Sequence, residues 1–377
     1  MKEYKIGIDA RLYRRSSGGI GTYTQNFLEE LSKLDKKNQY FIFLTPDDLK
    51  EYNLKSSNFK PIKTISAHYS IKEQLSFFKE LKKYKLDLIH FTNFNHPVLY
   101  RGRFVVTIHD LTMTLFPAPG RQRGWVQRFF YHRILNNAIN KSNRIITDSK
   151  NTKKDILNFK KTDPQKIDVV YLASEKGYRP ESSLDKAQKL KEKYKIKKPY
   201  ILFVSQWRPH KGIINLVKSF EVLRKRYKQY DLNLVITGKP NSKFPQIKKG
   251  VKYSEARNNI ITPGFVDQED MSALYSHAEV FVFPSFYEGF GLNPLEAMAC
   301  GTPVATSRIS SIPEVCGKAA LYFDPHDIED IALKTQTILA NKKIRQDLIQ
   351  KGFKNNKKFS WKKTALETLT CYQQALK

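Results

Sequence analysis

Two glutamates with seven residues between them, Glu288 and Glu296, follow an apolar run that ends at Phe283. A carboxylate can accept hydrogen bonds from two hydroxyl groups at once, as the recognition of a sugar or a ribose requires. Gly289 and Gly291 allow backbone N–H groups to approach a ligand closely, and the start of the following helix favours an anion. The segment therefore predicts a site for a sugar or a nucleotide.

Glu296 also has an ordinary structural interpretation. Asn293 suits the N-cap of the helix and Pro294 its first position, so that Asn293-x-x-Glu296 resembles a capping box. Glu288, which directly follows Tyr287, has no comparable structural role. We therefore expect Glu288 to carry chemistry, while Glu296 stays open between capping the helix and binding a ligand.

A second candidate site combines two cations, Arg208 and Lys211, with Gly212 in a loop after another apolar run. Each cation taken alone is as readily an ordinary surface residue. At the start of a helix, however, the pair is placed to meet a phosphate-bearing ligand. The loop predicts a phosphate contact.

Two further segments carry weaker signals. His109 and Asp110 come directly after an apolar run at 104–108, where ligands bind in open α/β sheets. Gly19 and Gly21 half resemble the dinucleotide fingerprint G-x-G-x-x-G, but Thr24 stands at the last glycine position. The glycines therefore give only a weak indication of NAD binding.

Residues 120–147 contain six Arg and Lys residues and no acidic residue. Two interpretations stay open: a helix that lies on an anionic membrane surface, or a packed helix with a solvated basic face. Its basic and aromatic residues are Arg121, Arg123, Arg128, Arg133, Trp125, Phe129, Phe130 and Tyr131.

The elements that must position these residues alternate between short β-rich runs and helical patterns, which is typical of parallel α/β sheets. In the first half we expect strands at 4–9, 40–44, 86–91, 104–108, 144–147 and 167–171. In the second half we expect them at 200–205, 232–237, 259–262, 280–283, 303–306 and 320–323.

The polar, lysine-rich segment 174–199 lacks strand character and divides the two series. We expect an α/β protein with two doubly wound, Rossmann-like domains, at 1–185 and 195–359, joined near residue 190. The last residues, 360–377, have a strong helical pattern with no strand after them.

The composition limits the partners and the compartment. The chain has 377 residues, longer than the about 100–200 of one domain, with 66 Lys and Arg against 36 Asp and Glu, a net charge of +30. Such a charge attracts nucleic acid, anionic lipid or phosphorylated small molecules, or merely decorates solvated helices. We find no nucleic-acid recognition motif and no membrane-length apolar run, and the first residues lead us to expect a strand and not a signal peptide. Three cysteines at irregular spacing fit neither a disulfide framework nor a zinc site, so we expect a cytoplasmic protein.

Taken together, these segments resemble the family-4 retaining glycosyltransferases of the GT-B fold, nearly from end to end. The main carrier is Glu288-x7-Glu296. Support comes from segments 17–23, 107–110, 144–149, 208–212, 311–315 and 319–325. The loops 208–212 and 313–325 are most similar to members that build bacterial surface polysaccharides, often mannosyl- or rhamnosyltransferases.

The resemblance implies two facing domains with a cleft between them, the acceptor on the N-terminal side and the nucleotide-sugar on the C-terminal side. The helix from about Trp361 would cross back to the first domain. By resemblance, Glu296 binds the ribose, Glu288 the donor sugar or reacting centre, and His109 lies in the catalytic pocket. The remaining implied contacts are Arg208 and Lys211 on the diphosphate, Ser205, Gly289, Phe290, Gly291 and Leu292 on the donor, and Gly19, Gly21 and Asp110 near the diphosphate and acceptor.

One departure from the family pattern concerns a cation. Many members carry Gly-Arg-Leu shortly before the lysine, where this chain has Ser205-Gln206-Trp207. Arg208 then substitutes for the missing cation, and its assignment is weaker than that of Lys211. Because no Asp-x-Asp triplet is present, we expect neither a metal nor another cofactor. The resemblance implies front-face attack with retention, the leaving phosphate taking the acceptor's proton.

The function we expect is transfer of a hexose to a growing, lipid-linked glycan of lipopolysaccharide or exopolysaccharide, at the inner face of the cytoplasmic membrane. GDP-mannose is the favoured donor, with dTDP-rhamnose or a UDP-sugar as alternatives, and nucleic acid is not an expected partner. Two rival interpretations remain. A glycoside hydrolase would use Glu288 and Glu296 as its two carboxylates but leaves the cationic loop without a role. A non-catalytic protein that binds nucleotide-sugars or polyanions would account for the charge.

Overall fold

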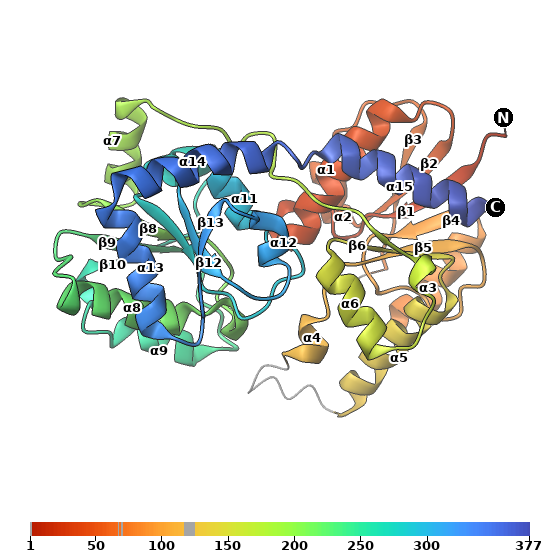
Figure 1. Ribbon diagram of the computed structural model, residues 1–377. Helices are drawn as coiled ribbons and strands as arrows, with labels where there is room; N and C mark the ends of the chain where they lie inside the picture. Colours follow the sequence, from red (N-terminus) through yellow and green to blue (C-terminus); the bar gives the residue numbers. More distant parts are fainter. Residues whose placement is uncertain (1, 67, 69–70, 117–124) are drawn as a thin grey trace. The chain divides into compact units, whose positions relative to one another are not determined.

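The computed structural model describes residues 2–66, 68, 71–116 and 125–377. The chain folds into two compact units, each built around one parallel sheet, as the alternating pattern predicts (Figure 1). Among the described residues, the first unit comprises 2–111, 125–172 and 360–377, and the second comprises 112–116 and 173–359.

The first unit contains a seven-stranded parallel sheet in the order β3-β2-β1-β4-β5-β6-β7. Its strands are β1 (Lys5–Asp9), β2 (Gln39–Leu44), β3 (Phe59–Lys63), β4 (Leu88–Phe91), β5 (Phe104–Ile108), β6 (Arg144–Thr147) and β7 (Ile167–Val169). Strand β3 was not predicted from the sequence. This edge strand exposes Lys60 and Pro61 to solvent, so its sequence lacks an apolar run, and an edge is where a sheet tolerates proline.

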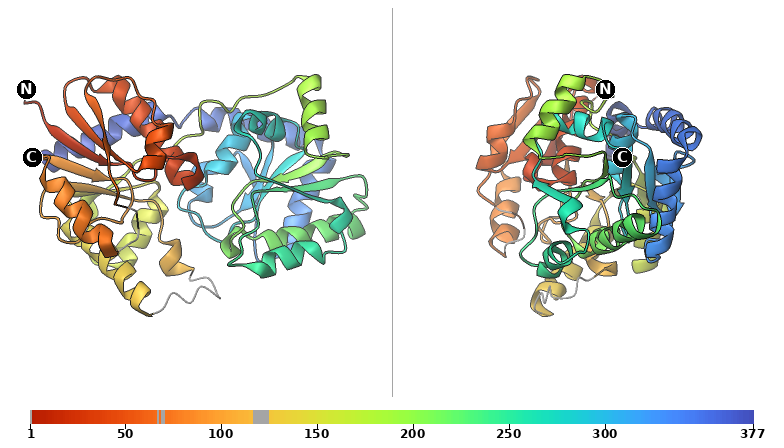
Figure 2. Two further views of the ribbon diagram at one scale, coloured as in Figure 1. Left: turned by 180° about the vertical axis from the view of Figure 1, so that it is seen from behind. Right: turned by 90° about the vertical axis from the view of Figure 1, so that its left-hand side faces the viewer.

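Helices cover both faces of this sheet. They are α1 (Gly19–Leu34), α2 (Pro46–Glu51), α3 (Ile71–Lys82), α5 (Trp125–Lys141), α6 (Lys150–Phe159) and α15 (Trp361–Leu376). One apolar core joins α3, α5 and α6 to the sheet. In Figure 2, left, α3 (orange) and α5 (yellow) lie on the near face, and α15 (dark blue) lies behind the sheet.

The C-terminal helix α15 returns to the first unit and packs beside α1, which confirms the predicted crossover (Figure 1). Two hydrogen bonds anchor it. The Tyr372 hydroxyl lies 2.7 Å from Nδ1 of His90, a buried residue of β4, and Thr364 Oγ1 donates to the carbonyl of Tyr171 at 2.6 Å. The ends of the chain therefore complete the same unit.

The second unit contains a six-stranded parallel sheet in the order β10-β9-β8-β11-β12-β13. Its strands are β8 (Tyr200–Phe203), β9 (Asn233–Thr237), β10 (Ile260–Gly264), β11 (Val280–Phe283), β12 (Val304–Ser307) and β13 (Ala320–Phe323). All six were predicted, within two residues at each end.

The helices of this unit also form two layers (Figure 1). One layer contains α8 (Ile213–Arg226), α9 (Pro245–Lys252) and α13 (Ile328–Ala340). The other contains α7 (Leu184–Lys193), α10 (Gln268–Ser276), α11 (Leu292–Ala299) and α14 (Lys342–Asn356). Two short helices, α4 (Thr112–Leu115) and α12 (Ile312–Cys316), complete the unit.

The chain passes from the first unit to the second after residue 172, whereas the sequence analysis placed the junction near residue 190. Hydrogen bonds explain the difference. The Glu181 backbone N–H donates to Ser276 Oγ at 3.0 Å, and Ser272 Oγ donates to the Gly177 carbonyl at 3.0 Å. The segment lacks strands, but its backbone is tied to α10 of the second unit.

Candidate active site

The strongest candidate site lies where the loops after β8 and β11 meet. These two strands are hydrogen-bonded neighbours, so their carboxyl ends open side by side, at the edge where α/β sheets bind ligands. Lys211 Nζ donates to Oε1 and Oε2 of Glu288 at 2.7 and 2.9 Å. Only 15 % of the Lys211 side chain and 12 % of the Glu288 side chain are exposed. The structure thus joins the two strongest predicted residues in one ion pair.

A glycine makes this close approach of the two loops possible. Gly212 has a φ of 70°, and a Cβ there would lie 2.0 Å from the Pro284 carbonyl oxygen. A backbone hydrogen bond also joins the two loops: the Phe286 N–H donates to the His210 carbonyl at 2.7 Å. Burial, with Lys211 nearby, lowers the pKa of His210 to about 3, so this histidine is neutral.

The loop that carries Glu288 is also held from the side of β12. Ser310 Oγ accepts from the Glu288 N–H at 2.9 Å, and Ser311 Oγ lies 2.9 Å from the carbonyls of both Glu288 and Phe290. Sequence reasoning gave these two serines no role. Their signal was weak because a serine pair before a helix is also an ordinary capping pattern.

The capping box at Asn293, which the sequence left open as one role for Glu296, does not form. Helix α11 begins at Leu292, its N-cap is Gly291, and no side chain caps it. Gly291 takes this place because its φ of 102° is open to glycine, whereas Asn293 and Pro294 lie inside the first turn. The helix start therefore keeps the anion-favouring character that the sequence indicated.

Glu296 does not cap the helix and is buried among polar side chains. It is 8 % exposed and accepts from the Tyr275 hydroxyl at 3.0 Å and from Asn293 Nδ2 at 3.3 Å. Burial raises the pKa of Glu296 to about 7, although both hydrogen bonds act in the opposite direction. Its carboxyl group therefore changes charge near neutral pH. Tyr275, on α10, was not anticipated from the sequence.

Arg208 and Ser205 lie in the loop that carries Lys211. Arg208 is exposed and precedes the short 3-10 turn η3 (Pro209–Lys211), while Ser205 is half-buried. Gln206, at the departure from the family pattern, is exposed, and Trp207 is buried with its Nε1 donating to the Thr237 carbonyl at 3.0 Å. In the loop 205–211, Arg208 is therefore exposed to solvent, whereas Lys211 is largely buried in its ion pair with Glu288.

His109, in the first unit, is fixed at both ring nitrogens. Nδ1 lies 2.7 Å from Asp148 Oδ2, and Nε2 lies 2.9 Å from the carbonyl oxygen of Thr92. Burial lowers the pKa of His109, but the neighbouring Asp148 carboxylate outweighs it and raises this pKa overall. Asp110 beside it is half-buried. Neither partner of the histidine was anticipated, because they lie 17 and 39 residues away in the chain.

The two predicted glycines of the first unit lie within the first turn of α1. Gly18, with a φ of 69°, caps the helix, and Gly19 is its first residue. A Cβ at the buried Gly21 would lie 2.2 Å from the Arg14 carbonyl oxygen, because the preceding loop crosses the helix there. Gly21 is therefore needed for packing, whatever it contributes to a ligand.

Thus Ser205, Arg208, Lys211, Glu288–Leu292 and Glu296 belong to the second unit, and Gly19, Gly21, His109 and Asp110 belong to the first. Within the described ranges, no three or more His, Cys, Asp or Glu side chains are grouped to hold a metal ion. Across the same residues, no helix combines the length and the apolar character needed to cross a membrane.

Comparisons with known proteins place the chain in a family. The model for glycosyl transferases group 1 matches residues 186–355, and that for Glycosyltransferase Family 4 matches residues 17–173. O-antigen chain mannosyltransferase B of Escherichia coli is 30 % identical over 298 residues, 78 % of this chain and 76 % of that protein. A serotype-specific mannosyltransferase of the same species is 35 % identical over 184 residues, which span 48 % of this chain but only 23 % of that one.

A solved structure shows the same fold over the whole chain. Sucrose-phosphate synthase from Thermosynechococcus elongatus superposes with a TM-score of 0.78 at 20 % identity, covering 99 % of each chain. This likeness confirms the predicted GT-B fold class, with two doubly wound domains. With the family models and the relative aligned over 78 % of this chain, it leads to one conclusion: the chain is a glycosyltransferase and belongs to the group 1 glycosyl transferases of family 4.

Proposed function

We propose that this glycosyltransferase moves a hexose from a nucleotide-sugar to a growing surface glycan, with retention of configuration and without a metal ion. The observation that carries the proposal is the ion pair of Lys211 and Glu288 between two post-strand loops. GDP-mannose is the favoured donor because the relative that aligns with 78 % of this chain is named an O-antigen chain mannosyltransferase. dTDP-rhamnose and UDP-sugars are the alternatives.

The chemistry assigned to the second unit is stabilisation of the leaving diphosphate. The bond between the sugar C1 and the phosphate oxygen breaks, and negative charge develops on that oxygen. Lys211, Arg208 and the uncapped start of α11 favour an anion, so they would lower the energy of this charge. The acceptor oxygen forms the new bond to C1 from the same face, and its proton passes to the departing phosphate.

The two glutamates then have different roles. Glu288 pairs with Lys211. When the diphosphate attracts the lysine, Glu288 would be free to accept hydrogen bonds from hydroxyl groups of the donor sugar. Glu296 would accept both ribose hydroxyls, and the donated hydrogen bonds would favour its charged form. Gly289, Phe290, Gly291 and Leu292 connect the two carboxylates and supply backbone N–H groups to the donor.

The acceptor is assigned to the first unit, with His109, Asp110 and the turn of Gly19 and Gly21. His109 donates its Nε2 hydrogen to a backbone carbonyl, and its Nδ1 contacts the Asp148 carboxylate. We therefore assign His109 the role of a fixed positive charge and not that of a general base. The acceptor's proton accordingly goes to the leaving phosphate.

A lipid-linked acceptor would require contact with a membrane surface, and α5 is suited to it. Trp125, Phe129 and Phe130 are 82 %, 57 % and 43 % exposed, and Arg128 and Arg133 are exposed beside them. Aromatic rings and arginines of this kind favour the interface of an anionic bilayer. Two other arginines of the predicted basic stretch, Arg121 and Arg123, lie outside the described residues. These exposed side chains support the proposal that the protein acts at the inner face of the cytoplasmic membrane.

The test is incubation of the purified protein with GDP-mannose, dTDP-rhamnose and UDP-glucose in excess EDTA, with and without a glycan acceptor. We expect one nucleotide class to raise the thermal midpoint and to be released as nucleoside diphosphate, with both effects weakened in Glu288→Ala. NMR of the product would show the anomeric configuration of the donor retained.

Three results would redirect the proposal. Activity abolished by EDTA and restored by a divalent cation would contradict metal independence. Binding of a nucleotide-sugar with no turnover for any acceptor would favour the non-catalytic binding protein. Cleavage of an aryl glycoside with no nucleotide present would favour the hydrolase.

A further inference from the structure

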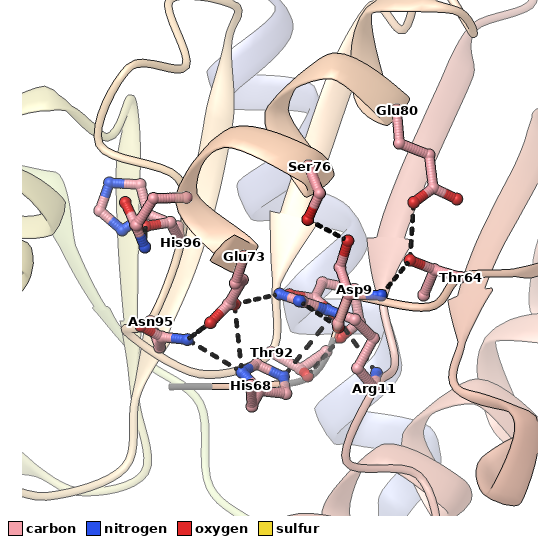
Figure 3. Close-up of polar contacts among 12 residues, drawn as sticks. Asp9, Arg11, Thr64, His68, Glu73, Ser76, Glu80, Thr92, Asn95 and His96 are labelled. Carbon is pink, nitrogen blue, oxygen red and sulfur yellow. Dashed lines mark hydrogen bonds and ion pairs between the residues drawn. The ribbon is translucent and has the colours of Figure 1, made fainter. Parts of the chain in front are cut away.

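A buried group of charged side chains lies at the carboxyl end of β1, in the first unit (Figure 3). Arg11 donates from Nε and Nη2 to the two carboxylate oxygens of Asp9, at 2.8 and 2.7 Å. Nη2 also donates to Glu73 at 2.7 Å, and Nη1 donates to the Ser66 carbonyl at 2.9 Å. The guanidinium lies 3.7 Å from the ring centroid of Phe77. We call Asp9, Arg11 and Glu73 the Arg11 cluster.

The Arg11 cluster is poorly explained by stability alone. The side chains of Arg11 and Glu73 are fully buried, and that of Asp9 is 2 % exposed. Buried ion pairs lose much of their attraction to desolvation, and apolar side chains of similar size often replace them without loss of stability. Such a cluster instead fixes orientation, because a planar guanidinium holds its carboxylate partners in one geometry.

Thr92 connects the Arg11 cluster to His109. Its Oγ1 donates to the backbone carbonyl of Asp9 at 2.6 Å, and its own carbonyl accepts from His109 Nε2 at 2.9 Å. Figure 3 shows Thr92 beside Asp9. Arg11 thus holds the side chain of Asp9, and Thr92 holds its backbone, so that the cluster and the histidine share one short connection.

The contact with Thr92 decides where the histidine carries a proton. A carbonyl oxygen only accepts hydrogen bonds, so His109 Nε2 must be an N–H donor. Among the described residues near the ring, Asp148 and Asp110 favour its charged form, and burial keeps His90 neutral with a pKa of about 3. The ring of Tyr23 also packs edge-on against the histidine, with 5.0 Å between the ring centroids, and burial raises the pKa of its hydroxyl, so it stays neutral. The Thr92 carbonyl acts with the two carboxylates and raises the pKa of His109.

We propose that the Arg11 cluster, acting through Thr92, positions His109 by holding the carbonyl that fixes the ring and its Nε2 proton. Asp9, Arg11, Glu73 and Thr92 are positioning residues, because they act on the histidine and not on the substrate. The inference rests on the proposed function only for the participation of His109 in transfer. The state of the ring can be measured without any substrate.

The deciding variant is Thr92→Val, which removes the hydrogen bond to the Asp9 carbonyl. It keeps the shape of the side chain and leaves Asp9 and His109 unchanged. Thr92→Ser retains the hydroxyl and serves as the rescue. Thr64→Val is the control for a buried threonine hydroxyl beside the same cluster: Thr64 donates to Glu80 at 2.6 Å and accepts from the Ser66 N–H at 3.2 Å, and neither bond involves Thr92 or His109 (Figure 3).

The first readout is NMR of the histidine ring nitrogens during a pH titration, with the His109 signal assigned from His109→Gln. In Thr92→Val we expect the Nε2 signal to move and the pKa of His109 to fall. The second readout is transfer kinetics, where kcat should fall on the order of fivefold, the effect of one neutral hydrogen bond, with the donor KM unchanged. Thr92→Ser and Thr64→Val should match the wild type in both.

Arg11→Lys tests the cluster itself, because it keeps the charge and loses the planar fork; we expect it to move the same ring signal in the same direction. If this variant does not fold, Thr92→Val decides. The inference is overturned if the His109 signal is unchanged in folded Thr92→Val, or if Thr64→Val moves it equally. Ring shifts as expected in a protein that transfers no sugar would support the inference and count against the proposed function alone.

Discussion

Lys211 Nζ lies 2.7 and 2.9 Å from the two carboxylate oxygens of Glu288, and this pair connects the loops that follow two neighbouring strands. The pair neutralises both groups and orients them before any donor arrives. A diphosphate carries more negative charge than one carboxylate, so it can compete for the lysine and release the glutamate to sugar hydroxyls. In the proposed function, the ion pair therefore holds both side chains in place before the donor binds and can still open when it does.

The approach of the two loops should depend on Gly212. In Gly212→Ala we expect a loss of about 1–2 kcal/mol from the left-handed backbone, with a further loss because the new Cβ would meet the Pro284 carbonyl at 2.0 Å. Gly264→Ala is the control, since Gly264 has a φ of 81° but no atom within 4 Å of a Cβ. Denaturant unfolding and donor binding of both variants would separate backbone strain from the clash. Equal losses in the two variants would contradict the role of the close approach.

The raised pKa of Glu296 should make stability depend on pH. The folded pKa of about 7 lies above the ordinary value of 4.5, so the folded state holds its proton longer than the unfolded state does. This contribution is complete below about pH 4.5 and is lost as pH rises through 7, on the order of 3 kcal/mol in total. Glu296→Gln should therefore flatten the pH dependence of unfolding between these limits and be more stable than the wild type at pH 8. An unchanged pH profile in the variant would be inconsistent with a raised pKa.

Donor binding should show the opposite dependence on pH. Ribose hydroxyls bind best to the charged carboxylate, so the affinity for the nucleotide should rise from pH 6 to pH 8 in the wild type. Calorimetry of Glu296→Gln should give weaker binding that does not change over this range. A wild-type affinity that falls as pH rises would argue against the assignment to ribose.

The anchor of α15 should contribute measurably to the first unit. Tyr372→Phe removes the partner of the buried His90 Nδ1, and a buried polar group left unpaired costs about 1–3 kcal/mol. Unfolding in urea would measure this loss. The exposed Tyr253, changed to Phe, should stay within about 0.5 kcal/mol of the wild type. Similar values for the two variants would mean that the hydroxyl of Tyr372 is not an anchor.

The aromatic residues of α5 should govern binding to membranes. Co-sedimentation with vesicles that contain phosphatidylglycerol should exceed that with neutral vesicles and weaken as salt is added. The double variant Trp125→Ser with Phe129→Ser should lose this binding, whereas Phe265→Ser, at an equally exposed ring in the second unit, should not. If the wild type does not distinguish anionic from neutral vesicles, the membrane assignment fails.

Much of the fold could be predicted because buried parallel strands are short apolar runs between helical patterns. The edge strand β3 escaped since Lys60 and Pro61 interrupt its pattern. The end of the first unit was predicted too late in the chain. Backbone groups of Gly177 and Glu181 form hydrogen bonds with side chains of α10, and such contacts leave no periodic signal in the sequence.

The site was predictable where its residues follow strands, as Lys211 and Glu288 do, although 77 residues separate them. The start of α11 was misplaced because Asn293 is a good capping residue, and only the backbone shows that Gly291 takes that position. The partners of His109 were out of reach, since a backbone carbonyl such as that of Thr92 carries no signature in the sequence.

The proposed role of Lys211 in stabilising the leaving diphosphate can be tested by one kinetic comparison. Lys211→Ala would be assayed at saturating donor beside Lys218→Ala, an exposed lysine seven residues further along, with the folded fraction of both measured at the assay temperature. We expect kcat of Lys211→Ala to fall by about 100-fold or more, as on loss of a group that stabilises transition-state charge, while the protein remains folded and Lys218→Ala keeps its activity. A decrease no larger than the loss of folded protein would contradict the assignment of Lys211 to the leaving diphosphate.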